Sequence, residues 1–320
     1  MITIKVTDDD FIPSASLGTQ PKWHIGNQWF KQDFDDADQA LTEVIVSRIL
    51  EKSNLAANPL TNEQDFVKYD FAKIVFNNKA YPGCVSQDFK REHEEFIPLE
   101  NYIAQLTGTS LLLVSSQLAR TSKDDPARPI RNFVDIVTQN GLPGYEKFLT
   151  AVIELDALIL NSDRHTLNLG VLVQDRNLRI CPIFDNGQGF FSDIPYNPGA
   201  DGFRRLKRGV DGMPFYPLDR QKRLCEELYG KQFQTTFSKD DLQKILGEAS
   251  ALYPDKKLQK AELFVTLQME AYMHDLVIKP PLRSESLSLD ELVKPITLQT
   301  GRQAPVKSQD KHTSFPGTRD

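Results

Sequence analysis

Two short apolar runs around a polar turn, with a polar loop on each side, govern how the middle of this chain can fold. The sequence reads LILNSDRHTLNLGVLV, then QDRN, then LRICPIFDNGQGF. Apolar runs of this length around such a turn predict a β-hairpin. Because a hairpin brings its two ends together, the loop that contains Asp163 and Asn168 should lie beside Asp185, which directly follows the hairpin.

Asp163, Asn168 and Asp185 are residue types that phosphoryl transfer uses. Phosphates and magnesium need hard oxygen ligands, and the attacking hydroxyl needs a proton acceptor in line with the leaving group. In kinases an Asp positions or deprotonates the hydroxyl, an Asn five residues later holds one metal ion, and an Asp after the hairpin bridges metal and phosphate. The spacing therefore predicts Asp163 as the catalytic base, and Asn168 and Asp185 as magnesium ligands. Taken alone, Asp163 would more often be a turn or capping residue.

The N-terminal region predicts a small sheet interrupted by one helix. The segments ITIKV, WHIGNQWFKQDF and FAKIVFNNKAYPGCV are strand-like, and Asn77-Asn78 forms a hairpin turn between two of the strands. Apolar residues at helical spacing predict a helix over residues 38–52, with Asp36 or Asp38 as its N-cap.

Lys31 and Glu43 complete the predicted catalytic set. Lys31 lies on a strand shortly before the predicted helix, and Glu43 lies on that helix. A lysine that reaches the α- and β-phosphates, held by a glutamate of the helix, is the other ion pair of the kinase arrangement. The alternative for Lys31 is a solvated lysine on an edge strand. The preceding turn, SASLGTQPKWHI, could place backbone N–H groups over the phosphates, although it lacks the pattern G-x-G-x-x-G.

The chain after residue 89 predicts a larger, helical part. Helical periodicity covers residues 99–106, 130–137, 144–160, 240–252, where Ser238 is the N-cap, and 258–276. After about residue 279 the chain is rich in Pro, Ser, Lys and Gln, which predicts a disordered tail. We therefore expect an α+β protein with parts at residues 1–88, 89–281 and 282–320.

Composition narrows the functional classes. The net charge of -6 argues against a protein that binds nucleic acid directly, because that binding depends on clustered Lys and Arg. The three cysteines are far apart, which indicates reduced thiols rather than disulfides or a zinc site. The N-terminus has no export signal, and the most apolar stretch, residues 148–160, is too short to span a bilayer. A cytoplasmic protein without membrane contact is expected.

The motif D-R-H-x-x-N, followed by a hairpin and P-I-F-D, resembles the HipA-like kinases, and among them the small stand-alone CtkA-type serine/threonine kinases. The resemblance spans about residues 25–188 and includes WFKQDF, LTEVIVSRIL, the segment ending CVSQDF, NSDRHTLNLG and PIFDNG. It implies a two-lobed protein-kinase-like fold: a small β-rich N-lobe with one helix and a larger helical C-lobe that contains the catalytic β-hairpin. It also implies ATP and Mg2+ as cofactors, and Ser/Thr phosphorylation of a protein substrate or of the chain itself.

By the same resemblance, Lys31 is the phosphate lysine and Glu43 is its partner. Further nucleotide contacts are expected from the phosphate loop and from the hinge between the lobes, namely Gly18, Thr19, Gln20, Val85, Ser86 and Asp88. The phosphate loop matches the family poorly. Asn186-Gly187 replaces the Phe-Gly of ordinary kinases, so a switch built on that Phe is not expected.

Several residues around this set have two interpretations each. His165 could act as a general base, because imidazole titrates near neutral pH, or it could brace the loop and leave Asp163 to meet the hydroxyl. Arg164 could pair with a carboxylate or phosphate, or lie on the surface. The same choice between a solvated basic face and a docking patch applies to Arg204, Arg205, Lys207 and Arg208. By family analogy, candidate autophosphorylation sites are Ser14, Ser16 and Thr19.

Two other functions remain open at this point. A small-molecule kinase of the aminoglycoside type uses a similar D-x-x-x-x-N and Asp pair on a related architecture. A nucleotide-binding protein without catalysis, partnered with a DNA-binding antitoxin, is the alternative from a different class.

Overall fold

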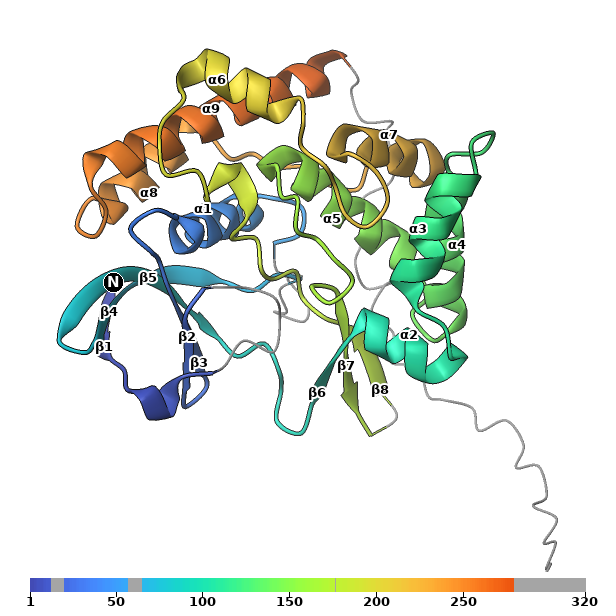
Figure 1. Ribbon diagram of the computed structural model, residues 1–320, viewed down its shortest axis with the longest axis horizontal. Helices are drawn as coiled ribbons and strands as arrows, with labels where there is room; N and C mark the ends of the chain where they lie inside the picture. Colours follow the sequence, from blue (N-terminus) through green and yellow to red (C-terminus); the bar gives the residue numbers. More distant parts are fainter. Residues whose placement is uncertain (13–19, 57–64, 176, 279–320) are drawn as a thin grey trace, which may run out of the picture.

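The structure, a computed structural model, describes residues 1–12, 20–56, 65–175 and 177–278. A curled β-sheet lies at one side of the molecule and most of the helices lie at the other (Figure 1). Three predictions fall outside the described residues: the candidate sites Ser14, Ser16, Gly18 and Thr19, residue 176 in the hairpin turn, and the tail over residues 282–320. The predicted boundaries at residues 88 and 281 stay predictions.

The N-terminal sheet has five described strands in the order β1-β4-β5-β3-β2. Their bounds are Ile2–Lys5 (β1), Lys22–Ile25 (β2), Gln28–Gln32 (β3), Tyr69–Phe76 (β4) and Lys79–Gln87 (β5). β1 runs parallel to β4, and the other pairs are antiparallel. The predicted turn at Asn77-Asn78 is confirmed: both residues have positive φ, 50° and 60°, which suits the twist of a two-residue hairpin.

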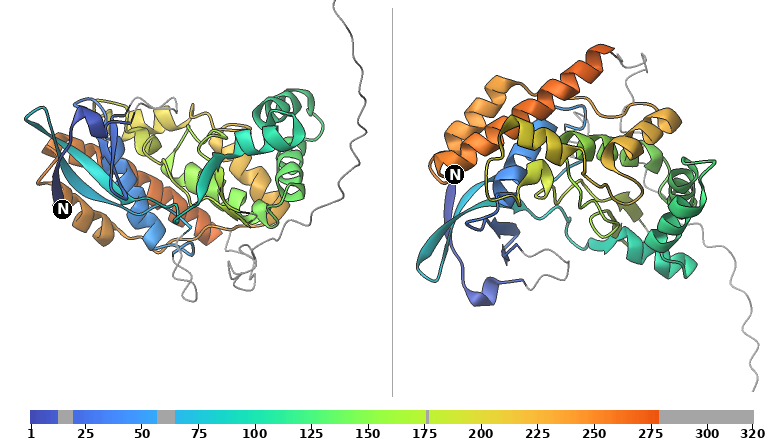
Figure 2. Two further views of the ribbon diagram at one scale, coloured as in Figure 1. Left: turned by 90° about the horizontal axis from the view of Figure 1, so that it is seen from below. Right: turned by 45° about the horizontal axis from the view of Figure 1, so that its top comes forward.

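Helix α1, Gln39–Glu51, lies between this sheet and the helical part (Figure 2). Nearly all of its side chains are buried, because strands β4 and β5 cover one face and α8 packs on another. Asp38 occupies the N-cap position, as one prediction had it, but its carboxylate makes no capping hydrogen bond. The backbone N–H groups of Ala40 and Leu41 donate instead to the carboxylate of Asp33, at 2.6 and 3.2 Å.

The predicted central hairpin is confirmed as β7, Gly170–Gln174, and β8, Asn177–Ile180. A third strand, β6 at Glu95–Pro98, pairs with β7, where a helical region was expected. Gly170 makes room for this strand, because a Cβ at residue 170 would lie 2.2 Å from the ring of Phe96. The glycine allows β6 to pack directly against the hairpin (Figure 1).

The described chain has eight further α-helices and two short 3-10 helices, Asp8–Asp10 and Gly189–Phe191. The α-helices are α2 (Leu99–Thr107), α3 (Leu111–Thr121), α4 (Arg128–Gln139), α5 (Tyr145–Ile159), α6 (Gly199–Lys207), α7 (Leu218–Tyr229), α8 (Lys239–Ala249) and α9 (Asp255–Ile278). The predicted N-cap Ser238 is confirmed and takes part in a capping box with Asp241. Within the described part of the chain, none of the helices combines the length and hydropathy needed to cross a membrane.

Candidate active site

Lys31 lies at the centre of the site and contacts two carboxylates from distant parts of the chain. Its Nζ donates to Glu43 Oε1 on α1 at 2.5 Å and to Asp185 Oδ1 at 2.9 Å. The ring of Tyr69 on β4 lies 5.3 Å from the ammonium. Strand β5 can approach Lys31 because residue 83 is a glycine, whose Cβ would lie 2.4 Å from the Lys31 carbonyl oxygen. The structure therefore brings Lys31 and Glu43 together as expected, and adds Asp185 to the pair.

Glu43 and Asp185 are held at this point by the backbone after β8. Glu43 is fully buried, and its Oε2 accepts a hydrogen bond from the backbone N–H of Asn186 at 3.0 Å. Asp185 has φ +58°, a conformation that non-glycine residues adopt rarely and often at functional sites. The side chain of Asp185 is 38% exposed, so part of the carboxylate is open to solvent while it contacts Lys31.

The loop before the hairpin is closed by its own hydrogen bonds. The carbonyl oxygen of Asp163 accepts from Asn168 Nδ2 at 3.0 Å and from the His165 backbone N–H at 2.8 Å. Asn168 is buried, whereas the Asp163 side chain is 50% exposed. Because the amide nitrogen of Asn168 is engaged, its amide oxygen is the side-chain atom that can serve as a ligand.

Arg164 joins this loop to the segment after the hairpin. Its guanidinium donates to both carboxylate oxygens of Asp156, with shortest distances of 3.0 Å, to the carbonyl oxygen of Phe184 at 2.6 Å and to Asn186 Oδ1 at 2.6 Å. Arg164 is 1% exposed, so the surface interpretation was wrong and the carboxylate interpretation is confirmed. Through Arg164, the two polar loops that flank the hairpin lie against each other.

The charged groups of the site shift one another's pKa values. Burial alone would lower the pKa of Lys31, but the carboxylates of Asp185 and Glu43 outweigh it and hold that pKa well above its ordinary value. Burial alone would raise the pKa of Asp185, but the charge of Lys31 outweighs it and the pKa of Asp185 is lowered. Lys31 and Asp185 are therefore both ionised at neutral pH. Burial raises the pKa of Asp163, with His165 opposing and Asp185 adding to the rise.

The donor set of the site fits magnesium. Asp185 offers a carboxylate and Asn168 an amide oxygen, which are hard ligands of the kind that Mg2+ prefers. Among the described residues, no group of three or more His, Cys, Asp or Glu is arranged to hold a metal ion. A site with two protein ligands is what magnesium uses when phosphates and water complete its coordination.

The other residues expected to contact the nucleotide lie in different places, and two of them are outside the described residues. Gly18 and Thr19 lie outside the described residues, and Gln20 directs its side-chain amide at Asp33, 3.4 Å away. Val85 and Ser86 lie within β5, between β3 and β4 and close to the strand's end at Gln87. The chain leaves the sheet at Asp88, whose backbone N–H donates to the carbonyl oxygen of Asn27 at 2.7 Å.

His165 braces the loop through its backbone. Its N–H bonds the Asp163 carbonyl, and its own carbonyl accepts from the Asn168 N–H at 2.9 Å. The imidazole Nε2 lies 4.0 Å from Asp163 Oδ1, which is too long for a hydrogen bond. The imidazole therefore shares no proton with Asp163 in this arrangement.

Sequence reasoning missed two residues that complete the site. Asp156 lies within the apolar stretch 148–160 and was given no role, although a buried carboxylate in an apolar helix indicates a cationic partner. Lys22 pairs in register with Lys31 across β2 and β3, so its side chain emerges on the same face of the sheet. The sequence alone could not place Lys22 opposite Lys31, because that depends on the register in which β2 and β3 pair.

Comparisons with known proteins bear on the fold. No protein-family model and no curated protein matches the chain. The crystal structure of a Helicobacter pylori proinflammatory kinase, CtkA, is similar with a TM-score of 0.55 at 13% identity, over 88% of this chain and 100% of that chain. A structure of the Shewanella oneidensis MR-1 toxin–antitoxin system HipA, HipB and its operator DNA aligns with a TM-score of 0.30 at 12% identity, over 86% of this chain and 61% of that chain. The chain thus has the two-lobed, α+β kinase-like fold that its motifs predicted, similar to the fold of the CtkA kinase.

Proposed function

We propose that this chain is an ATP- and magnesium-dependent phosphotransferase that acts on serine or threonine hydroxyls of proteins. The observation that carries the proposal is the contact of Lys31 with both Glu43 and Asp185, beside a loop that exposes Asp163. A largely buried lysine held between two carboxylates is arranged to receive phosphate oxygens once one carboxylate turns to a metal ion.

Each residue has a distinct task in the proposed reaction. Lys31 binds phosphate oxygens of ATP, and Glu43 holds Lys31 in place. Asn168 and Asp185 supply the protein ligands of magnesium, which neutralises charge that develops on the phosphates. Asp163 accepts the proton of the attacking hydroxyl, a task that its half-exposed carboxylate and raised pKa favour. In this proposal the backbone of residues 85–88 meets the adenine.

The test is phosphate transfer from γ-labelled ATP to a generic protein substrate or to the chain itself. We expect transfer that requires magnesium and stops when the metal is chelated. Asp163→Asn should still bind ATP but lose at least about a hundredfold in turnover, the usual contribution of a general base. Asp175→Asn is the matched control, because Asp175 lies in the turn at the other end of the hairpin. Full turnover by Asp163→Asn would show that another group accepts the proton.

The class of substrate needs a separate measurement. Transfer to peptides that contain Ser, Thr or Tyr should be compared with transfer to small aminated alcohols under the same conditions. We expect the label on Ser or Thr. Label on small alcohols alone would replace the protein substrate by a small molecule, and ATP binding without any transfer would indicate a nucleotide-binding protein.

A further inference from the structure

Lys22 is a second cation on the sheet face that bears Lys31. In the β2–β3 pair, Lys22 lies directly opposite Lys31, and Trp23 lies opposite Phe30. Trp23 and Phe30 belong to the small core on the other face of the sheet, so both lysines emerge on the face that carries Lys31, Glu43 and Asp185. Directly paired residues have Cβ atoms about 5 Å apart, so the two ammonium groups occupy one region.

The charge of Lys22 is coupled to the same site. Burial lowers the pKa of Lys22, the ammonium of Lys31 lowers it further, and the Asp185 carboxylate opposes both. Two like charges directly opposite each other in a sheet destabilise the pair. Glu43 and Asp185 both contact Lys31 and offset part of this repulsion, and the charge of Asp185 also acts on Lys22.

The same site changes its charge balance when it binds nucleotide. In the proposed function Asp185 turns towards magnesium, so Lys22 and Lys31 both lose a negatively charged neighbour. The triphosphate of the nucleotide would then supply the negative charge that balances the two lysines. The sequence lacks the G-x-G-x-x-G pattern whose backbone N–H groups cradle phosphates in many kinases. A side-chain cation on the adjacent strand can perform that task.

We propose that Lys22 is a phosphate-binding residue that works beside Lys31 to bind the triphosphate of the nucleotide. This inference rests on the proposed function, since it concerns the same nucleotide. It assigns the recognition of the phosphates to two lysines on neighbouring strands and leaves the nucleoside to other residues.

The test compares binding of ATP with magnesium and binding of adenosine, each by calorimetry, in three variants. Lys22→Gln should weaken ATP binding about 10- to 100-fold, as expected for a lost hydrogen bond between charged groups, and leave adenosine binding unchanged. Lys22→Arg should stay within about threefold of the unmodified protein, because a guanidinium also binds phosphate. Lys5→Gln, an exposed lysine on β1 at the far edge of the sheet, is the control for charge and should bind both ligands normally.

Thermal melts without ligand, with ATP and magnesium, and with adenosine separate this role from a structural one. For Lys22→Gln, the stabilisation by ATP should shrink while the stabilisation by adenosine stays that of the unmodified chain. A lower melting temperature with equal losses for ATP and adenosine would overturn the inference and make Lys22 a structural lysine.

The outcomes also separate this inference from the proposed function. Unmodified protein that binds ATP, with Lys22→Gln binding ATP equally well, would refute the role of Lys22 alone. Unmodified protein that does not bind ATP at all would refute both.

Discussion

Arg164 is a positive charge that the protein has taken out of water almost completely. A buried guanidinium is tolerated only when its donors are satisfied, and here Asp156, Phe184 and Asn186 satisfy them from three directions. The planar fork of arginine matches the carboxylate of Asp156 with two parallel hydrogen bonds. Arg164 therefore positions the residues on both sides of Asp185 without touching the expected ligands.

Arg164→Lys should lower the free energy of unfolding by about 3 kcal/mol, because lysine keeps the charge but cannot make the paired bonds or reach all three partners. Phosphate transfer should fall as well, since the two loops lose their connection. Urea unfolding and the transfer assay measure the two effects. Arg204→Lys on α6 is the control, because Arg204 is exposed and forms an i,i+3 ion pair with Asp201. A variant as stable as the unmodified protein would show that Arg164 does not hold the loops.

At the residue scale, the sequence predicted the residues whose types and spacing are dictated by chemistry. Asp163, Asn168 and Asp185 were located because a hairpin must bring its ends together, and the structure places them on the two loops that Arg164 connects. Lys22 and Asp156 were missed because their importance depends on strand register and on partners far away in the sequence. Neither can be read from local spacing.

Helix α1 is fixed to the helical part of the molecule at both ends. At its N-terminus, Asp38 forms ion pairs with Lys257 Nζ at 2.8 Å and with Lys260 Nζ at 2.5 Å, both on α9. At its C-terminal end, the backbone of Lys52 accepts a hydrogen bond from the Thr236 N–H at 2.8 Å. Because α1 carries Glu43, these contacts hold Glu43 in reach of Lys31.

The N-terminal cap of α1 extends this connection. Asp33 accepts hydrogen bonds from two N–H groups of α1 and from the Tyr253 hydroxyl at 2.8 Å, all of them buried. Tyr253 stands just before α9, so a single carboxylate links β3, α1 and the C-terminal helices. The carboxylates predicted as caps were Asp36 and Asp38. Asp33 replaces them because the chain turns back after β3 and brings that carboxylate to the end of the helix.

Tyr253→Phe should lower the free energy of unfolding by about 1–2 kcal/mol, because it leaves the buried Asp33 carboxylate with one hydrogen bond fewer and changes little else in shape. Chemical unfolding at neutral pH measures this loss. Tyr81→Phe is the matched control, since Tyr81 is partly exposed on β5 and packs against Lys79. Superimposable unfolding curves for Tyr253→Phe and the unmodified chain would mean that the hydrogen bond from Tyr253 to Asp33 does not stabilise the fold.

At the element scale, periodicity predicted α2, α4, α5, α8 and α9, whose apolar residues recur at helical spacing. Helices α6 and α7 were missed because each is dominated by charged residues around a narrow apolar stripe, and α3 was missed as well. Strand β6 was missed because four residues next to a helix carry too little pattern of their own. Pairing with β7, and not local preference, makes it a strand.

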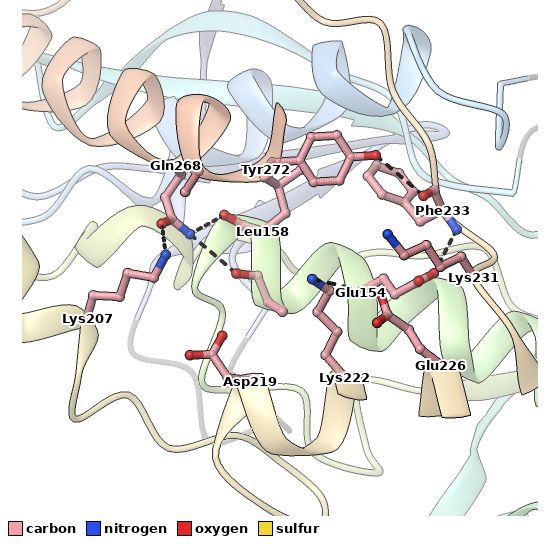
Figure 3. A pocket seen from close by; sticks show the side chains of 12 residues that line it. Glu154, Leu158, Lys207, Asp219, Lys222, Glu226, Lys231, Phe233, Gln268 and Tyr272 are labelled. Atoms are coloured by element: carbon pink, nitrogen blue, oxygen red, sulfur yellow. Dashed lines mark hydrogen bonds and ion pairs between the residues drawn. The ribbon is translucent and has the colours of Figure 1, made fainter. Parts of the chain in front are cut away.

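At the scale of the whole molecule, one continuous hydrophobic core runs from α1 through the C-terminal helices. A polar pocket lies among α5, α7 and α9, lined by Glu154, Glu226, Lys222, Lys231 and Gln268 together with neighbouring residues (Figure 3). Glu154 is 5% exposed, and its Oε2 accepts from the backbone N–H groups of Gln232 and Phe233 at 2.8 and 2.7 Å. The carboxylate thus holds the segment after α7 against the core.

Glu154 makes the stability of the molecule depend on pH. Burial raises the pKa of Glu154 to about 8, and the neighbouring Glu226 adds to the rise against the two backbone donors. A pKa raised in the folded state means that the folded protein binds a proton that the unfolded chain releases near its ordinary value. The contribution of Glu154 to the free energy of unfolding is complete below about pH 4.5, and it is lost as the pH rises through about 8.

We therefore expect the unmodified protein to lose on the order of 2 kcal/mol of unfolding free energy between pH 6 and 9 that Glu154→Gln retains. Glutamine can accept the same backbone hydrogen bonds, but it never acquires the charge that Glu226 opposes. The two proteins should have similar stability near pH 4.5, diverge as the pH rises from there, and keep a constant difference above about pH 8, which chemical unfolding at a series of pH values measures. Glu248→Gln on α8, an exposed position, should follow the unmodified chain throughout. Parallel pH profiles for Glu154→Gln and the unmodified protein would show that Glu154 is already ionised in the fold, with its charge satisfied by the backbone of the segment after α7.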